Sequence, residues 1–360
     1  MNSVQFAKIL LDWHTINKRI LPWKEDNDPY KIWLSEIILQ QTRVSQGTPY
    51  FLRFLKEYPD INALADASSD QVMKSWQGLG YYTRARNLHA TAQDVVQRYN
   101  SVFPDTYEEV LALKGIGPYT AAAIVSFAYE LPYPVVDGNV IRLVSRILGI
   151  MEAIESKSVK KHILYFVKQS ILDVRPSDFN QAIMDFGATL CTPASPDCTV
   201  CPFNQYCKAY QSDMVSSIPF RTKKKERVTR FFHYYDISDP NGMTLLHCRS
   251  QNDIWQNLYQ FPMLETSSKD SPGQNDIKKE LADISDISPE SFGHPNKTAE
   301  IRQTLTHRKI VGTFYKLVSN TPFMEINKSY CLVDRQKVSN FAFPKIITSY
   351  LENNSGSKNY

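Results

Sequence analysis

Residues 113–120 read Leu113-Lys114-Gly115-Ile116-Gly117-Pro118-Tyr119-Thr120 and join two stretches in which apolar residues recur at helical spacing. The two glycines permit a tight turn, because glycine adopts backbone conformations that other residues avoid. Free N–H groups at the start of the following helix act together with the helix dipole and suit a phosphate. The segment therefore predicts a helical hairpin with a candidate phosphate site at Gly115 and Gly117. A G-x-G turn by itself also joins helices that bind nothing.

Around this hairpin, the chain up to residue 211 is helical in pattern, and few windows alternate with period two. Caps and breaks such as Asp28-Pro29 and Arg175-Pro176 separate the helical stretches. We therefore expect an all-α first domain. Its predicted helices are Val4–Asn17, Tyr30–Tyr50, Gln71–Trp76, Arg84–Tyr99, Tyr107–Leu113, Thr120–Glu130, Val140–Leu148, Ser158–Ile171 and Phe179–Leu190.

After residue 216 the pattern changes, and an α+β second domain is predicted. The turn signal Asp239-Pro240-Asn241-Gly242 separates two strand-like stretches. The predicted strands are Val228–Ile237, Met243–Arg249, Lys309–Val318 and Glu325–Val333, and the predicted helices are Asn275–Ile284 and Pro344–Leu351. The expected division of the chain is a catalytic domain at 1–211, a basic linker at 212–227, a second domain at 228–351 and a tail at 352–360.

Four cysteines lie close together at the end of the helical part. Cys191, Cys198, Cys201 and Cys207 have the spacing C-x6-C-x2-C-x5-C. Four thiolates satisfy either a four-iron cluster or a zinc ion. Zinc sites usually pair two short C-x2-4-C knuckles, whereas this stretch has one, so the spacing favours the cluster. Disulfides are the least expected outcome, because the chain shows neither a signal peptide nor a membrane-spanning stretch.

Charge alone says little about the partner. The net charge is +4, but Arg221–Arg230 holds six basic residues and one acid. Such a run is either a solvated linker or a strap along a phosphate backbone. We expect a cytoplasmic, nucleoid-associated protein with no membrane contact.

The order of three motifs resembles the helix-hairpin-helix superfamily of DNA glycosylases. These motifs are the hairpin LKGIGPYTAAAI, the segment Val136-Asp137-Gly138-Asn139-Val140 and the four cysteines. The stretch WLSEIILQQTRV at 33–44 closely resembles the signature of MutY-type adenine DNA glycosylases. The resemblance implies a helical barrel at about 23–133, an iron–sulfur subdomain at about 1–22 plus 134–211, and a [4Fe-4S] cluster on the four cysteines.

The resemblance also implies roles for two carboxylates. Breaking an N-glycosidic bond builds positive charge on the sugar, which a carboxylate can stabilise, and adenine leaves more readily once protonated. Glu36 is then the general acid and Asp137 the stabilising carboxylate, although Asp137 could be only a helix cap and Glu36 only a residue of a wet helix face. Bifunctional relatives have lysine where this chain has Tyr119, so strand cleavage through a Schiff base is not expected. Tyr119 is expected to form a hydrogen bond with Asp137, and Asn139 completes the implied catalytic set.

Further residues are implied to contact DNA. In the family, the loop matching residues 77–88 enters the minor groove, with Leu79 and Tyr81 as wedges and Gln41 filling the gap left by an extruded base. The hairpin glycines would hold a backbone phosphate. The implied adenine pocket comprises Arg19, Trp23, Lys24, Leu39, Val44 and Gln181, and Lys24 stands where relatives often have arginine.

The second domain loosely resembles the MutT-like (Nudix-fold) domain of the same family. The acidic cluster of Nudix hydrolases is absent from the sequence, so nucleotide hydrolysis is not expected. Thr306 and His307 correspond to the loop that reads 8-oxoguanine, whereas Leu305 replaces an aromatic residue. Both could instead belong to an ordinary turn.

The resemblance therefore implies a monomeric, monofunctional adenine DNA glycosylase. Its partner would be duplex DNA with adenine opposite 8-oxoguanine or guanine. Two alternatives remain: an endonuclease III-like glycosylase and lyase acting on oxidised pyrimidines, and a non-catalytic iron–sulfur protein that binds DNA or senses redox state.

Overall fold

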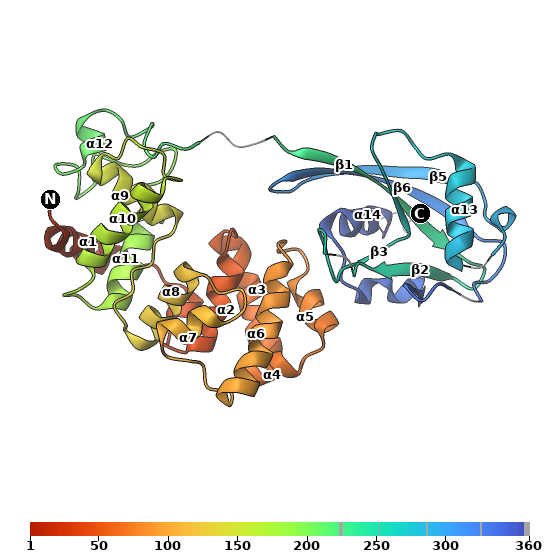
Figure 1. Cartoon of the computed structure of the whole chain (residues 1–360), viewed down its shortest axis with the longest axis horizontal. Coiled ribbons are helices and arrows are strands. Elements are labelled where there is room, and N and C mark those ends of the chain that lie inside the picture. The colour runs from red at the N-terminus through yellow and green to blue at the C-terminus, as the bar shows by residue number, and fades with distance from the viewer. Residues whose placement is uncertain (223–225, 251, 286, 325, 356–360) are drawn as a thin grey trace. The chain divides into compact units, whose positions relative to one another are not determined.

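The computed structural model describes residues 1–222, 226–250, 252–285, 287–324 and 326–355 (Figure 1). By packing, the chain forms two compact units. The first comprises Met1–Asp66 and Asn87–Lys224, and the second comprises Ala67–Arg86 and Lys225–Tyr360. Residues 67–86 thus pack with the C-terminal half, although they lie within the sequence of the helical half. Among the described residues, no helix is both long and apolar enough to cross a membrane.

The part of the chain before residue 211 is all-α, as predicted. Its elements are α1 (Ser3–Asn17), the short 3-10 helix η1 (Pro22–Lys24), α2 (Pro29–Leu39), α3 (Val44–Glu57), α4 (Ile61–Asp66), α5 (Ser69–Trp76), α6 (Thr83–Tyr99), α7 (Tyr107–Ala112), α8 (Pro118–Tyr129), α9 (Gly138–Leu148), α10 (Lys157–Ser170), α11 (Pro176–Thr189) and α12 (Lys208–Gln211).

One prediction in this part is wrong. The single helix expected over Tyr30–Tyr50 is two helices, because α2 ends at Leu39 and α3 begins at Val44. Gln41 has a φ of 57°, which a right-handed helix cannot accommodate. The sequence contains no glycine or proline at this break, and the short helices α4 and α12 were also not predicted.

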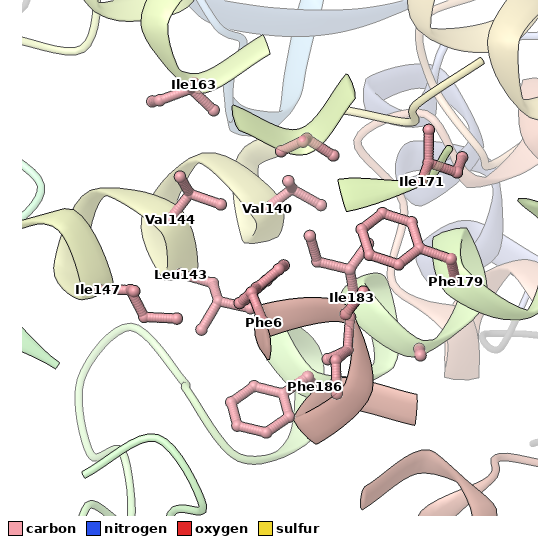
Figure 2. Close-up of a cluster of buried hydrophobic side chains, with 14 of the residues drawn as sticks. Phe6, Val140, Leu143, Val144, Ile147, Ile163, Ile171, Phe179, Ile183 and Phe186 are labelled. Atoms are coloured by element: carbon pink, nitrogen blue, oxygen red, sulfur yellow. The ribbon is translucent and has the colours of Figure 1, made fainter. Parts of the chain in front are cut away.

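A buried core joins α1, α9, α10 and α11 (Figure 2). Along α9, Val140, Leu143, Val144 and Ile147 recur at i, i+3, i+4 and i+7 and are all buried. Phe6 of α1 packs against Phe203 of the cysteine loop, with ring centroids 5.2 Å apart. Burying each such side chain contributes roughly 1.5–3 kcal/mol, so this core holds the start of α9 and the cysteine loop in one body.

The C-terminal part is α+β, as predicted. Its elements are β1 (Val228–Ser238), β2 (Met243–Cys248), β3 (Tyr259–Gln260), β4 (Met263–Thr266), α13 (Gln274–Ser285), the 3-10 helix η2 (Pro289–Ser291), β5 (Asn296–Thr304), β6 (Arg308–Val318), β7 (Tyr330–Asp334), the 3-10 helix η3 (Arg335–Asn340) and α14 (Lys345–Ser355). One sheet has the order β4-β1-β6-β5, with β1 and β6 parallel, and the other has the order β3-β2-β7.

Helices cover both faces of the four-stranded sheet. Successive side chains of a strand point to opposite faces. Tyr235 of β1 belongs to a cluster with Leu281 of α13, whereas Phe314 of β6 stacks on Tyr350 of α14 at 4.2 Å between ring centroids. The sheet therefore lies between α13 and α14, which is a layered α+β arrangement.

Several predicted boundaries in this part need correction. The strand expected over Glu325–Val333 begins only at Tyr330, and Glu325 itself lies outside the described residues. The strands β3, β4 and β5 were not predicted. In the basic segment, residues 223–225 lie outside the described residues, and Arg230 is paired with Glu265 at 2.6 Å. A role for Arg221–Arg230 in binding phosphates stays a prediction.

Candidate active site

Glu36 is a buried acid on an apolar helix. It lies on α2 among buried residues such as Ile32 and Ile37, and its exposed fraction is 9%. Burial raises the pKa of the Glu36 carboxyl to about 7, and the charge of Asp137 adds to this shift, while a hydrogen bond with Tyr119 opposes it. A carboxyl with this pKa keeps a proton available near neutral pH.

Asp137 caps the N-terminus of α9. Its Oδ1 accepts a hydrogen bond from the Val140 N–H at 2.8 Å, and its Oδ2 accepts one from the Asn139 amide at 2.7 Å. Burial raises the pKa of the Asp137 carboxyl above its ordinary value, although these hydrogen bonds oppose the shift. The capping role considered from the sequence is therefore present, and it fixes the orientation of the carboxylate.

Tyr119 lies in the first turn of α8, directly after the hairpin. Burial raises the pKa of its hydroxyl well above the ordinary value, and the carboxylates of Glu36 and Asp137 raise it further. The hydroxyl is thus a proton donor. It contacts Glu36, and it also lies 3.6 Å from the sulfur of Met184. A hydrogen bond from Tyr119 to Asp137 stays a prediction.

A cavity of about 1090 Å³ brings these groups together. All the residues of the predicted base pocket line it as well, although they come from separate segments of the sequence. The predicted residues on its wall are Arg19, Trp23, Lys24, Glu36, Leu39, Gln41, Val44, Tyr119, Asp137, Asn139 and Gln181. The volume exceeds that of a purine base, so the cavity can hold an extruded nucleotide together with water.

A close contact between α9 and α11 positions Asn139. A Cβ on Gly187 would lie 2.7 Å from the Cβ of Asn139, so only glycine fits there without a shift. The guanidinium of Arg142 donates to Asn139 Oδ1 at 3.0 Å and to the Cys191 carbonyl at 2.8 Å. The partner of Asp137 is therefore held from the cysteine loop, which the sequence did not reveal.

The hairpin has the expected geometry. Gly115 has a φ of 79°, and a Cβ there would lie 2.6 Å from the Cβ of Asn87. Thr91 donates from its hydroxyl to the Lys114 carbonyl at 2.7 Å and ties the turn to α6. Gly117 precedes α8, whose first N–H groups have no partner within the helix. These groups are suited to a phosphate.

The four clustered cysteines line one small cavity with Leu143, Ile147 and Phe203. Arg146 donates to the sulfur of Cys191 at 3.4 Å. Among the described residues, no three His, Cys, Asp or Glu side chains are placed to hold a single metal ion. Four thiols around an apolar cavity are the donor set that a four-iron cluster requires, so the residues fit that group.

The predicted wedge residues differ in exposure. Leu79 is 6% exposed, whereas Tyr81 is 46% exposed and has a φ of 47°. Gln41 is also exposed and has positive φ. A non-glycine residue with positive φ is strained, and strain of this kind occurs often at functional sites. Tyr81 and Gln41 thus fit contacts with DNA better than buried Leu79 does.

Thr306 and His307 form the exposed turn between β5 and β6. The Leu305 N–H closes the turn by donating to the Arg308 carbonyl at 2.8 Å. The hydroxyls of Thr306 and Tyr81 lie 2.7 Å apart within the second compact unit. Thr306, in the turn that is predicted to read the base opposite adenine, is therefore in direct contact with Tyr81, a residue that is predicted to wedge between bases.

Comparison with known proteins gives a consistent result. Residues 34–169 match the HhH-GPD superfamily of base excision DNA repair proteins, and residues 233–353 match the NUDIX domain. The chain is 37% identical over 264 residues to the adenine DNA glycosylase of Buchnera aphidicola subsp. Baizongia pistaciae, covering 73% of this chain and 74% of that protein. The chain belongs to the adenine DNA glycosylase family. The family member of Mus musculus is 39% identical over 233 residues, covering 61% of this chain and 45% of that protein.

Solved structures agree with this family's fold. A thermostable thymine-DNA glycosylase superposes with a TM-score of 0.53 at 25% identity, covering 58% of this chain and 97% of that one. Endonuclease III in a non-covalent complex with DNA superposes with a TM-score of 0.51 at 21% identity, covering 59% of this chain and 99% of that one. The helical part therefore has the fold of these two proteins, and the NUDIX domain follows it.

Two residues that organise the site of this adenine DNA glycosylase family member were not predicted from the sequence. Arg142 lies mid-helix on α9, and Asp185 lies mid-helix on α11. Both are charged and both are buried, at 6% and 1% exposure. A charge on the apolar face of an amphipathic helix was the available signal. The Cys191 carbonyl that Arg142 contacts, and the His14, Arg19 and Lys24 side chains that Asp185 contacts, lie too far away in sequence to be inferred.

Proposed function

We propose that the protein hydrolyses the N-glycosidic bond of adenine in duplex DNA and so initiates base-excision repair. The observation that carries the proposal is the pairing of a protonatable Glu36 with a capped Asp137 on one cavity large enough for a nucleotide. The carboxyls have different environments and hence different roles. Its partner is duplex DNA, which the protein meets as a monomer associated with the nucleoid.

In this mechanism Glu36 donates its proton to the imidazole-ring nitrogen of adenine, which makes the base a better leaving group. Asp137 stays ionised and stabilises the positive charge that develops on the sugar. Each of its two oxygens accepts one hydrogen bond, and these bonds fix the orientation of the carboxylate before the reaction, so that it need not rearrange as charge develops on the sugar. Tyr119 donates to the Glu36 carboxyl and keeps it oriented. Water then completes the hydrolysis.

Tyr119 supports a monofunctional reaction. A tyrosine cannot form the Schiff base that a lysine forms with the sugar, so the strand is left intact. We propose adenine opposite 8-oxoguanine or guanine as the substrate, and we propose that Thr306 and His307 read the opposite base. Tyr81, Leu79 and Gln41 then fill the gap that the extruded base leaves in the DNA duplex. The hairpin amides of Gly115 and Gly117 hold a backbone phosphate.

The test is single-turnover release of adenine from duplexes that differ only in the base opposite adenine. Release opposite 8-oxoguanine and guanine, but not opposite thymine, is expected, with strand breaks only after alkali. Duplexes with an oxidised pyrimidine serve as the comparison. Release of the pyrimidine, or strand breaks without alkali, would overturn the proposal.

The pH dependence of the reaction follows from the two carboxyls. Because Glu36 must be protonated and its pKa is about 7, the rate is expected to fall about tenfold per pH unit above pH 7. At lower pH the rate should fall as Asp137 takes up a proton. Rates measured below saturation from about pH 5 to about pH 9, with DNA affinity determined at each pH, check this. A rate that rises through pH 7 would instead assign Glu36 a basic role.

We also propose that Cys191, Cys198, Cys201 and Cys207 hold a [4Fe-4S] cluster. When bound, the cluster would cross-link the loop that carries the Cys191 carbonyl, and that carbonyl accepts from Arg142. Protein purified without oxygen is expected to contain about four iron and four sulfide per chain. Cys198→Ala should lose most of the iron, whereas Cys248→Ala in the second unit should keep it. One zinc per chain and no iron would contradict the assignment.

A further inference from the structure

Asp185 lines the catalytic cavity and connects several segments of its wall through hydrogen bonds and ion pairs. It lies on α11, is 1% exposed, and faces four donors, three from distant segments of the chain and one from the preceding turn of α11. Its Oδ2 accepts from His14 at 3.2 Å and from Lys24 at 3.1 Å, and its Oδ1 accepts from Gln181 at 3.0 Å and lies 3.5 Å from Arg19. Three of these four partners line the predicted adenine pocket.

The Asp185 carboxyl is ionised. Burial alone would raise its pKa, but the hydrogen bonds and charges of His14, Lys24 and Arg19 outweigh burial and hold the pKa below the ordinary value. An ionised carboxylate only accepts hydrogen bonds. The atom of Gln181 that faces it at 3.0 Å must therefore be the amide nitrogen, which leaves the amide oxygen as the group turned away from Asp185.

That oxygen is available to a ligand. Gln181 and Asp185 are one turn apart on the same helix face, and both line the cavity. Among the residues that the structure describes, none donates a hydrogen bond to the Gln181 side-chain oxygen. An acceptor fixed on a cavity wall favours a ligand that presents an N–H group and opposes one that presents a carbonyl.

We infer that Asp185 is a positioning residue that locks the Gln181 amide as an acceptor and thereby makes the cavity select 6-aminopurines over 6-oxopurines. The inference rests on the proposed function, because the cavity must receive an extruded purine. Adenine carries an amino group at position 6, whereas hypoxanthine carries a carbonyl there and is otherwise nearly the same shape. In the Asp185→Asn variant, the new amide could donate to the Gln181 oxygen, the Gln181 amide could rotate, and the preference would weaken.

The experiment measures a ratio of rates, which does not depend on the folded fraction of a sample. Single-turnover release of adenine and of hypoxanthine, each opposite 8-oxoguanine, is compared for the native protein and Asp185→Asn. The ratio of adenine to hypoxanthine release is expected to fall about tenfold, the scale of one misplaced hydrogen bond. Asp173→Asn, the same charge change at an exposed position, should leave the ratio unchanged.

A double-mutant cycle separates positioning from mere support of the fold. In a Gln181→Leu background, adding Asp185→Asn should not lower the ratio further, because the amide on which Asp185 acts is gone. If Asp185→Asn does not fold, Asp185→Glu keeps the negative charge among the cations but moves the carboxylate out of register with Gln181, and the same drop is expected.

The outcomes are distinct. A native protein that releases no adenine removes the proposed function. Adenine release with an unchanged ratio in the Asp185 variants, or rates that fall equally for both bases, would overturn only this inference and leave Asp185 as a structural anchor.

Discussion

Glu36→Gln is expected to slow adenine release by about 10²- to 10⁴-fold, the usual contribution of a positioned acid. Glutamine has the shape of the protonated carboxyl and fits the same buried site on α2, but its amide is not acidic and cannot transfer a proton to the base. The measurement is single-turnover release opposite 8-oxoguanine, with DNA affinity determined in parallel. The affinity for DNA should be nearly unchanged, since Glu36 is 9% exposed and can contact only the base inside the cavity, not the rest of the duplex.

Two further readouts make this prediction specific. Because Glu36 accounts for the fall in rate above pH 7, the residual activity of Glu36→Gln should lose that dependence. Glu108→Gln, at an exposed position of α7, is the matched control and should release adenine at the native rate. Native-like release by Glu36→Gln would mean that the proton comes from another group.

Asp137→Asn is expected to reduce the rate by about 10²- to 10³-fold or more, because it removes the charge that stabilises the cationic sugar. The helix should survive, since asparagine caps helices as well as aspartate does and its oxygen can still accept from the Val140 N–H. The Asn139 amide, however, would face another amide N–H₂ group instead of Oδ2. Single-turnover release, together with a thermal unfolding curve, separates the loss of charge from any loss of fold.

Asp28→Asn is the control for this substitution. Asp28 is likewise an N-cap, that of α2, and accepts from the Tyr30 N–H two residues on at 2.9 Å, but it plays no part in the proposed chemistry. Both variants should show similar small shifts in Tm, while only Asp137→Asn loses activity. Equal losses of activity in the two variants would indicate that Asp137 acts only as a cap.

The local parts of this structure could be predicted from the sequence. The hairpin at Gly115, the cap at Asp137 and the amphipathic face of α9 each depend on neighbouring residues, and each is found where the pattern places it. The break after Leu39 could not be predicted, because it depends on a strained Gln41 that only the surrounding packing can hold. Likewise β5 carries mostly exposed polar side chains and shows no apolar alternation.

The site follows the same rule. Glu36 and Asp137 lie in recognisable motifs, whereas Asp185 is held ionised by His14, Lys24 and Arg19, which are 161 to 171 residues away in sequence. A buried ionic group of this kind is expensive to desolvate and is stable only when every partner is in place. No local sequence pattern shows whether those partners are in place, so the role of Asp185 in the pocket can be recognised only from the three-dimensional structure.

The contact at Gly187 has a consequence for tolerance to variation. Gly187 does not line the catalytic cavity and carries no side chain, yet a Cβ there would press on Asn139, the partner of Asp137. A search for inactivating changes that considers only charged and polar residues would pass over it. The spacing of two helix backbones is thus as restrictive as the catalytic groups themselves, and a single added methyl group is sufficient to test it.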